Sequence, residues 1–306
     1  MRVIVSNREY EVIFQITFLI KSIIIKIMKT SNNQYSQGLS RSARLFAHPI
    51  SRIFIATLFV ALPVALTLIL VQQALDKSMR QVWPQMVCAV LCIAAYVMYV
   101  NKVEKREVVE FSRVGAANEF GFGVVIGSVA ILVVLCTLMA TDAFQIVSTN
   151  QWITLASPFS EMLLVAFFEE ILFRGIIFRI VEKSIGTLSA LLISVVLFTL
   201  AHFPNAGITL LSIAVTAVAG LLFCAAYMVT RRLWLAVGIH FAWNFMSVAV
   251  FSLPTYGHPA KGFLQGKLSG PEWLSGGAYG IEGSLVTLVV LTIVTLWLLR
   301  IAKRRN

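Results

Sequence analysis

The chain has few charged residues for its length, and this shortage excludes a soluble globular protein. Asp, Glu, Lys and Arg make up 13% of its 306 residues, whereas a soluble domain carries roughly a quarter. Hydrophobic residues make up 58%, the mean hydropathy is +0.86, and apolar runs of about 20 residues recur along the chain. The sequence therefore predicts an all-α fold, a polytopic transmembrane helical bundle.

Cysteine is also scarce. Cys88 and Cys92 share a helical face because they are four residues apart, but no neighbouring residue completes a metal-binding motif with them. The others, Cys136 and Cys224, also lie inside apolar runs. We expect all four to be small core residues.

Eight apolar segments are predicted to be transmembrane helices. They form one bundle over residues 52–303 with short loops, and not several domains. The predicted spans are residues 53–73, 83–100, 121–140, 158–181, 185–203, 208–229, 233–251 and 283–301.

The net charge of +11 is divided among short segments between the apolar runs. Because no basic surface with interleaved aromatic residues emerges, the charge indicates membrane topology and no nucleic-acid partner. Fifteen Lys and Arg residues lie near the span ends on one side: Arg41, Arg44, Arg52, Lys102, Lys105, Arg106, Arg113, Arg179, Lys183, Arg231, Arg232, Arg300, Lys303, Arg304 and Arg305. Four lie on the other side: Lys77, Arg80, Lys261 and Lys267. Both termini are therefore predicted to be cytoplasmic, in the plasma or inner membrane if the cell is bacterial.

Residues 1–51 are predicted to be an N-terminal cytoplasmic extension that is partly disordered. Residues 1–30 are apolar but interrupted by lysines, so they would span a membrane poorly and could lie along its interface. The simpler expectation is that translation begins at Met28, which precedes a polar segment. At the other end of the chain, the connection 252–282 is rich in Gly and Pro and long enough to fold over the mouth of the bundle.

The segment FFEEILFRGIIFR places two adjacent carboxylates and an arginine inside an apolar run. Its helix is expected to start with Ser157 as N-cap and Pro158 at the first helical position. Glu170 and Arg174 are four residues apart with the acid first, so they are predicted to form an ion pair. Glu169 points about 100° away and has no such partner. Burial and the neighbouring charge favour its uptake of a proton, which suits a general base.

Two other predicted helices carry unusual polar groups. One contains Phe198 and His202, and the other contains His240 and Asn244; the members of each pair are four residues apart on one helical face. Ionisable groups inside a membrane are costly and are by default functional. Two histidines, an asparagine and a glutamate pair on three helices therefore indicate a site. His48 and His258 lie in loops and receive no role.

These motifs resemble those of the CPBP intramembrane proteases, also called the ABI or CAAX prenyl endopeptidase-like family. Glu169, Glu170 and Arg174 fit EExxxR, Phe198 and His202 fit FxxxH, and His240 and Asn244 fit HxxxN. Order and spacing agree over a protease-like core at about residues 150–250. The resemblance implies an intramembrane endopeptidase that hydrolyses a peptide bond of a membrane-associated protein or peptide.

The resemblance also implies roles for the residues. Glu169 would activate a water molecule and His202 would assist proton transfer. His240 and Asn244 would stabilise the tetrahedral oxyanion, for which Asn is a suitable donor. The supporting residues would be Glu170, Arg174 and Phe198.

Two mechanisms are compatible with this interpretation. The favoured one uses no cofactor. In the other, Zn²⁺ is held by His202, His240 and Glu169, because two histidines and a glutamate are a known catalytic zinc set. The chain lacks HExxH, and Asn is a poor zinc ligand.

A non-catalytic function is the alternative to proteolysis. In a membrane transporter, or in an immunity or binding protein, the same polar cluster could line a proton or substrate path. Against a transporter, no second EE-like segment occurs in a corresponding half of the chain. The expected partners are the lipid bilayer and a protein or peptide substrate.

Overall fold

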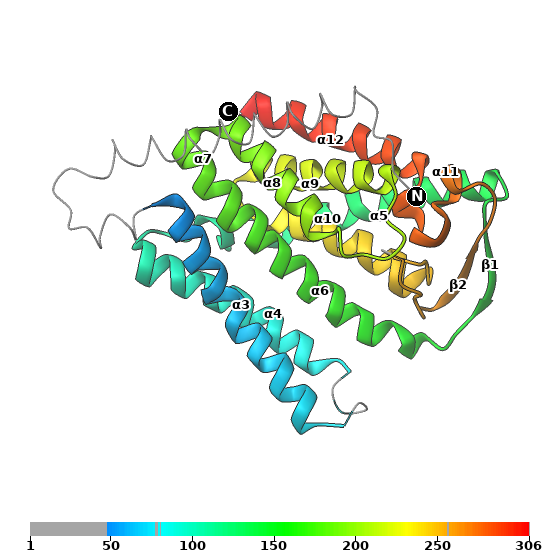
Figure 1. Ribbon diagram of the computed structural model, residues 1–306, viewed down its shortest axis with the longest axis horizontal. Helices are drawn as coiled ribbons and strands as arrows, with labels where there is room; N and C mark the ends of the chain where they lie inside the picture. The colour runs from blue at the N-terminus through cyan, green and yellow to red at the C-terminus, as the bar shows by residue number, and fades with distance from the viewer. Residues whose placement is uncertain (1–47, 77–78, 80, 256, 306) are drawn as a thin grey trace, which may run out of the picture.

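The computed structural model describes residues 48–76, 79, 81–255 and 257–305 (Figure 1). The predictions for residues 1–47, and the positions of Lys77 and Arg80, lie outside these ranges.

The described chain is a bundle of helices, which confirms the predicted fold class. Its α-helices are α3 (Pro49–Ala74), α4 (Trp83–Tyr99), α5 (Ala116–Ala140), α6 (Ala156–Glu170), α7 (Arg179–Ile185), α8 (Thr187–Ala201), α9 (Leu210–Thr230), α10 (Trp234–Phe245), α11 (Glu272–Ser275) and α12 (Leu285–Arg305). The π-helical segments are η2 (Val100–Glu104), η5 (Ile171–Phe178) and η6 (Met246–Val250). Short 3₁₀ turns are η3 (Val109–Phe111), η4 (Trp152–Leu155), η7 (Gly277–Tyr279) and η8 (Ile281–Gly283).

Within the described part of the chain, five helices are long and apolar enough to cross a membrane. They are Pro49–Ala74, Trp83–Glu104, Ala116–Ala140, Leu210–Thr230 and Leu285–Arg305. Two other predicted spans are shorter apolar helices, of which α8 has only 15 residues and the other runs from α10 through η6. The predicted span 158–181 is a continuous helical rod formed by α6, η5 and α7. The multi-pass membrane bundle is confirmed, and the count of eight spans stays a prediction.

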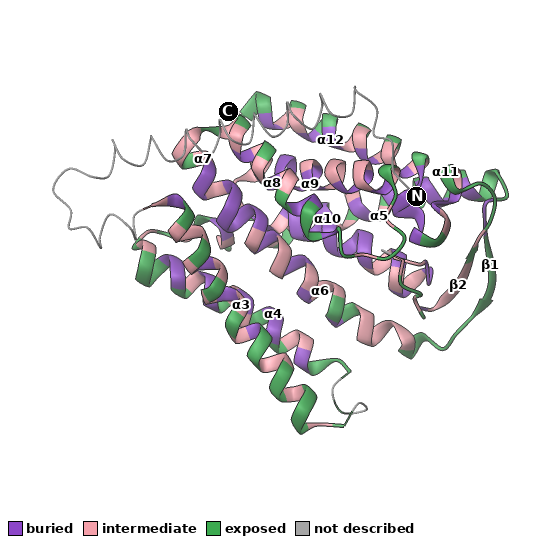
Figure 2. Cartoon of the chain, viewed as in Figure 1, coloured by how far each residue is buried: buried purple, intermediate pink, exposed green. Residues whose placement is uncertain are grey.

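The outer face of α3 suits contact with lipid. Six large apolar side chains spaced four residues apart along it are at least 38% exposed: Ile50, Phe54, Leu58, Leu62, Leu66 and Leu70. In water such a stripe would be an aggregation-prone patch, whereas the hydrocarbon core of a bilayer accepts it without cost. Figure 2 shows this exposure along α3 and the contrasting burial of α10 in the interior.

Close packing against α5 fixes the position of α10. A Cβ at Gly123 would lie 2.5 Å from the Leu235 carbonyl oxygen, and a Cβ at Gly238 would lie 2.4 Å from that of Phe120. Gly123 and Gly127 form a small-xxx-small pair, which lets two membrane helices approach closely. The α10 segment from Leu235 to Asn244 is buried throughout.

Two short strands that the sequence did not predict lie at one end of the bundle. Strand β1 (Phe144–Thr149) pairs antiparallel with β2 (Leu264–Leu268), with an irregularity between Ile146 and Ser148. Because β2 belongs to the connection 252–282, this pairing ties the long connection to the segment between α5 and α6.

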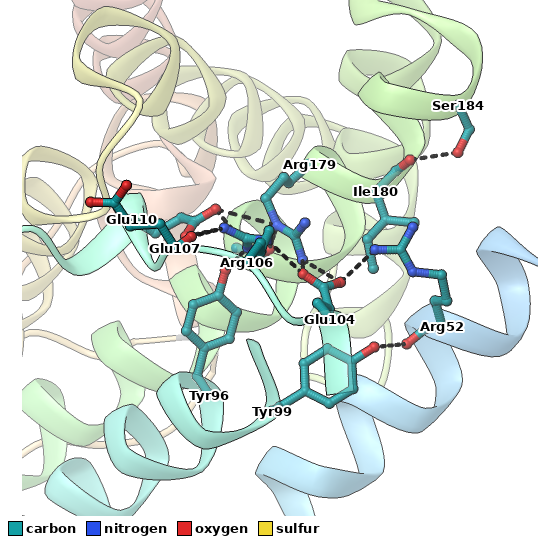
Figure 3. A network of polar contacts seen from close by, with 11 residues as sticks. Arg52, Tyr96, Tyr99, Glu104, Arg106, Glu107, Glu110, Arg179, Ile180 and Ser184 are labelled. Atoms are coloured by element: carbon teal, nitrogen blue, oxygen red, sulfur yellow. Dashed lines mark hydrogen bonds and ion pairs between the residues drawn. The ribbon is translucent and has the colours of Figure 1, made fainter. Parts of the chain in front are cut away.

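The other end of the bundle carries a network of ion pairs (Figure 3). Glu104, whose side chain is 2% exposed, pairs with Arg52 at 2.7 Å, Arg106 at 2.7 Å and Arg179 at 2.9 Å. Glu110 pairs with Arg106 at 2.9 Å. Burial acts to lower the pKa of Arg106, but hydrogen bonding and attraction from Glu110 and Glu104 outweigh it and raise that pKa above its usual value. These pairs join α3, η2 and α7.

One cysteine departs from its expected place. Cys88, Cys92 and Cys224 are buried as predicted, but Cys136 on α5 is exposed. The expectation of a core residue was wrong there, because an apolar run does not tell which side of a membrane helix faces its neighbours and which faces lipid.

Candidate active site

The rod that carries the two glutamates begins one residue before the predicted cap. Helix α6 starts at Ala156 after the 3₁₀ turn η4, with no side-chain cap. The prediction that Ser157 is the N-cap was therefore wrong, and its hydroxyl instead donates to the Gln81 carbonyl at 2.9 Å. At Glu170 the α-helix gives way to the π-helix η5. π-helical turns are rare and occur frequently at functional sites.

The carbonyl of Gly175 fixes η5 to its surroundings. It accepts a hydrogen bond from the Tyr96 hydroxyl at 3.0 Å and another from Arg179 Nε at 2.7 Å. Arg179 also belongs to the ion-pair network around Glu104. The charged end of the bundle is thus linked directly to the turn that follows the glutamate pair.

Glu170 and Arg174 form the predicted ion pair. Arg174 Nη1 lies 3.0 Å from Glu170 Oε1, and both side chains are fully buried. Arg174 Nη2 donates to the Gly220 carbonyl of α9 at 2.7 Å. A buried pair of this kind needs additional hydrogen bonds to offset the cost of desolvation.

Aromatic rings complete the surroundings of Arg174, with Phe173 at 5.8 Å and two others closer. Its guanidinium carbon lies 4.8 Å from the ring centre of Phe198 and 5.1 Å from that of Phe223. A cation over an aromatic face is attracted by the ring quadrupole, and more strongly where water is excluded. Phe198 was predicted to be a supporting residue, whereas Phe223 was not singled out because it belongs to no polar motif.

His240 lies between the two glutamates. Its Nδ1 is 2.9 Å from Glu170 Oε1, and its Nε2 is 3.9 Å from Glu169 Oε2. A carboxylate oxygen accepts, so Nδ1 carries the proton of that first bond. The imidazole also stacks on Phe223, with ring centres 4.5 Å apart and planes 14° apart. These contacts fix the ring with Nε2 turned toward Glu169.

His202 is held in a comparable way from α8. Its Nδ1 lies 2.8 Å from the carbonyl oxygen of Phe198, one helical turn earlier. Because a carbonyl only accepts, Nδ1 carries a proton and Nε2 of the neutral ring is the basic nitrogen. The Phe198 ring packs on the imidazole at 4.6 Å.

Glu169, His202 and Asn244 line one half-open cavity of about 590 Å³. Glu169 Oε2 and Asn244 Oδ1 are buried, and neither has a hydrogen-bond partner within the described part of the chain. Such unpaired buried polar atoms are uncommon and call for an explanation, for which a ligand is a natural candidate. The structure thus brings Glu169, His202 and Asn244 together around one cavity, while His240 lies behind them and is not part of this cavity's lining.

The cavity is also lined by residues that were not predicted to be functional. His258, Pro259, Ala260 and Lys261, all from the connection 252–282, line it together with Glu161 of α6. This connection lies beside the candidate site, as its length suggested. Gly123 and Gly127, which hold α10 in place, were also missed, although their small-xxx-small spacing inside an apolar run was a readable signal.

The geometry of the acidic and imidazole groups does not form a preformed metal site. Among the described residues, no group of three or more His, Cys, Asp or Glu side chains could hold a metal ion. The set proposed from sequence, His202, His240 and Glu169, is not such a group among the described residues, and the zinc alternative stays a prediction. Their arrangement instead offers a carboxylate, a basic imidazole nitrogen and an amide around one cavity.

Part of the chain matches the model of a known protein family. Residues 151–246 match the family model described as type II CAAX prenyl endopeptidase Rce1-like. The matched segment contains each of the candidate site residues. No curated protein and no solved structure matches the chain.

Proposed function

We propose that the chain is an intramembrane endopeptidase related to the type II CAAX prenyl endopeptidase Rce1-like family, whose model residues 151–246 match, and that Glu169 is its general base. The single observation that supports this role is the position of Glu169 Oε2. It is buried in the cavity wall, unpaired within the described chain, and 3.9 Å from His240 Nε2. A water molecule beside these two atoms can hydrogen-bond to both of them.

In the proposed reaction, Glu169 takes a proton from water while the water oxygen attacks the carbonyl carbon of the scissile peptide bond. The tetrahedral intermediate then collapses, the C–N bond breaks, and the proton passes to the leaving amine. His202 assists this transfer through Nε2, which remains basic because Nδ1 donates to the Phe198 carbonyl. Water is consumed, and the products are one carboxylate and one amine.

The oxyanion of the intermediate is stabilised by His240 and Asn244. His240 can donate from Nε2 only if the ring carries both protons, because Nδ1–H already donates to Glu170. Fixed donors in a water-poor site stabilise a developing charge far more than they would in bulk water.

Glu170, Arg174 and Phe198 are positioning residues in this proposal. Glu170 holds the His240 ring, Arg174 neutralises Glu170, and Phe198 contacts both Arg174 and His202. None of them needs to touch the substrate.

The test compares cells that carry the wild-type chain with cells that carry Glu169→Ala. We expect at least one membrane-associated or released peptide to accumulate uncleaved in the variant, and mass spectrometry of membrane and medium fractions detects it. Equal processing in the two strains, with both chains inserted at equal levels, would contradict the protease assignment and favour a non-catalytic role.

The absence of a metal requirement is proposed as well, and chelation tests it. Purified protein treated with a strong zinc chelator is expected to keep its cleavage activity, because the proposed steps use only side chains of this chain. Loss of activity that added Zn²⁺ restores, together with about one zinc per chain by elemental analysis, would instead support the zinc alternative.

A further inference from the structure

The cavity of the candidate site extends from Glu169 toward the end of the bundle at which α6 begins. Its outer lining comes from Pro158 and Glu161 at the start of α6, Asn205 after α8, and Thr255 with residues 258–261 of the connection 252–282. From Glu161 to Glu169 the helix advances about 12 Å at 1.5 Å per residue. Glu169 therefore lies about two turns below the mouth.

On the side of Glu169 away from the mouth, packed side chains fill the space between Glu169 and the end of the bundle that carries the Glu104 ion pairs. Seven of the eight residues of η5 are buried, including Arg174 with an exposure of 0%. Within η5, the Gly175 carbonyl accepts a hydrogen bond from the Tyr96 hydroxyl. The ion pairs of Glu104 lie farther toward the same end of the bundle. A polypeptide cannot reach Glu169 from that end without displacing this packed layer.

The filled end is the one that carries the basic residues. Most described members of the larger Lys and Arg group lie at or near the ends of α3, η2, α7, α9 and α12, which gather at the left of Figure 1, and Arg113 lies between η3 and α5. Lys261 and Lys267 are the described members of the smaller group, and Lys261 lines the mouth itself. Since an excess of Lys and Arg marks the cytoplasmic side of a membrane protein, the mouth faces the other side.

We propose that the site is entered from the extracytoplasmic face and that its substrates are proteins or peptides whose scissile segment is presented there. This inference rests on the proposed function for the chemistry, and on the charge distribution and the cavity for the side. An extended chain advances about 3.3–3.6 Å per residue, so about four residues on one side of the scissile bond span the distance from Glu169 to the mouth.

The mouth is polar, which suits a polypeptide rather than a hydrocarbon chain. Glu161 lines it from α6, while His258 and Lys261 line it from the connection 252–282, and all three are exposed. The charged groups make this entrance costly for a hydrocarbon chain, although Pro158, Pro259 and Ala260 also line it. A peptide can hydrogen-bond to such groups along its main chain.

The side of the opening is tested by cysteine labelling in intact bacterial cells, using a membrane-impermeant maleimide. Lys267→Cys places a thiol at an exposed position of β2, outside the cavity lining, and Arg304→Cys places one at the exposed end of α12. The parent chain, with its own four cysteines, gives the background. We expect Lys267→Cys to label in intact cells and Arg304→Cys to label only after permeabilisation.

Cleavage sites mapped in the same cells show on which side of the membrane the substrate is cut. Cleavage sites that are present in the wild type and lost in Glu169→Ala are mapped on their proteins, and we expect them on extracytoplasmic segments. Reversed labelling, or Glu169-dependent cleavage within cytoplasmic segments, would overturn the inference. The expected labelling without any Glu169-dependent cleavage would overturn the proposed protease, while the side of the opening would stand.

Discussion

Replacing Glu169 by Gln is expected to lower the rate of peptide cleavage by about 10²–10⁴-fold, the usual contribution of a general base. The amide keeps the shape of the side chain and its place in the cavity wall but cannot take a proton from water. The rate is measured with purified protein on the peptide that accumulates in the inactive strain, under single-turnover conditions that separate chemistry from binding.

A matched control comes from the same helix and the same cavity. Glu161→Gln removes an exposed carboxylate that lies about two turns from Glu169 and makes no contact with His240 in the described structure. We expect it to change the rate constant for cleavage far less, with any effect falling on substrate binding. If the two substitutions lowered the rate constant equally, the cavity would depend on its overall negative charge and Glu169 would have no special role.

The loss should appear without loss of folding. Glu169 keeps 23% of its side chain exposed and forms no close ion pair, since its nearest basic nitrogen is 3.9 Å away. Removing its charge therefore leaves no buried group newly unpaired. The thermal midpoint of Glu169→Gln in detergent should match that of the wild type.

The sequence predicted the parts of the site that depend on local spacing. Glu170 and Arg174 face each other because residues four apart share a helical face, and this rule holds in any helix. The expectation that costly polar groups on α6, α8 and α10 converge followed from their burial alone. It needed no knowledge of the helix packing.

Contacts between distant segments could not be predicted in this way. The bond between His240 and Glu170 joins residues 70 positions apart, and it exists only because α5 holds α10 against the rod. Phe223 stacks on His240 although no motif contains it. The pairing of β1 with β2 was missed because short strands leave little periodicity in an apolar sequence.

Replacing Arg174 by Leu is expected to destabilise the folded protein by about 3–5 kcal/mol, the usual cost of leaving a buried charge without its partner. Glu170 would remain fully buried and would lose the guanidinium 3.0 Å away. The Gly220 carbonyl would lose its donor, and Phe198 and Phe223 would lose the cation between them. Unfolding by denaturant or heat in detergent measures the change.

A control pair distinguishes burial from simple loss of charge. Arg231 and Glu182 are 2.7 Å apart, but their side chains are 40% and 19% exposed. Arg231→Leu should therefore cost only about 0–1 kcal/mol, as is usual for solvated pairs. Similar losses for Arg174→Leu and Arg231→Leu would contradict the importance of burial at Arg174.

The double variant Glu170→Gln with Arg174→Leu separates the energetic role of the pair from its catalytic role. It removes both buried charges, so it should regain much of the stability that Arg174→Leu loses, because a neutral buried pair needs no counter-ion. The glutamine oxygen can still accept the hydrogen bond from His240 Nδ1. Cleavage should nevertheless stay impaired, since a neutral residue 170 no longer stabilises a cationic His240 at the oxyanion. Recovery of stability and cleavage together would show that the ion pair serves folding alone.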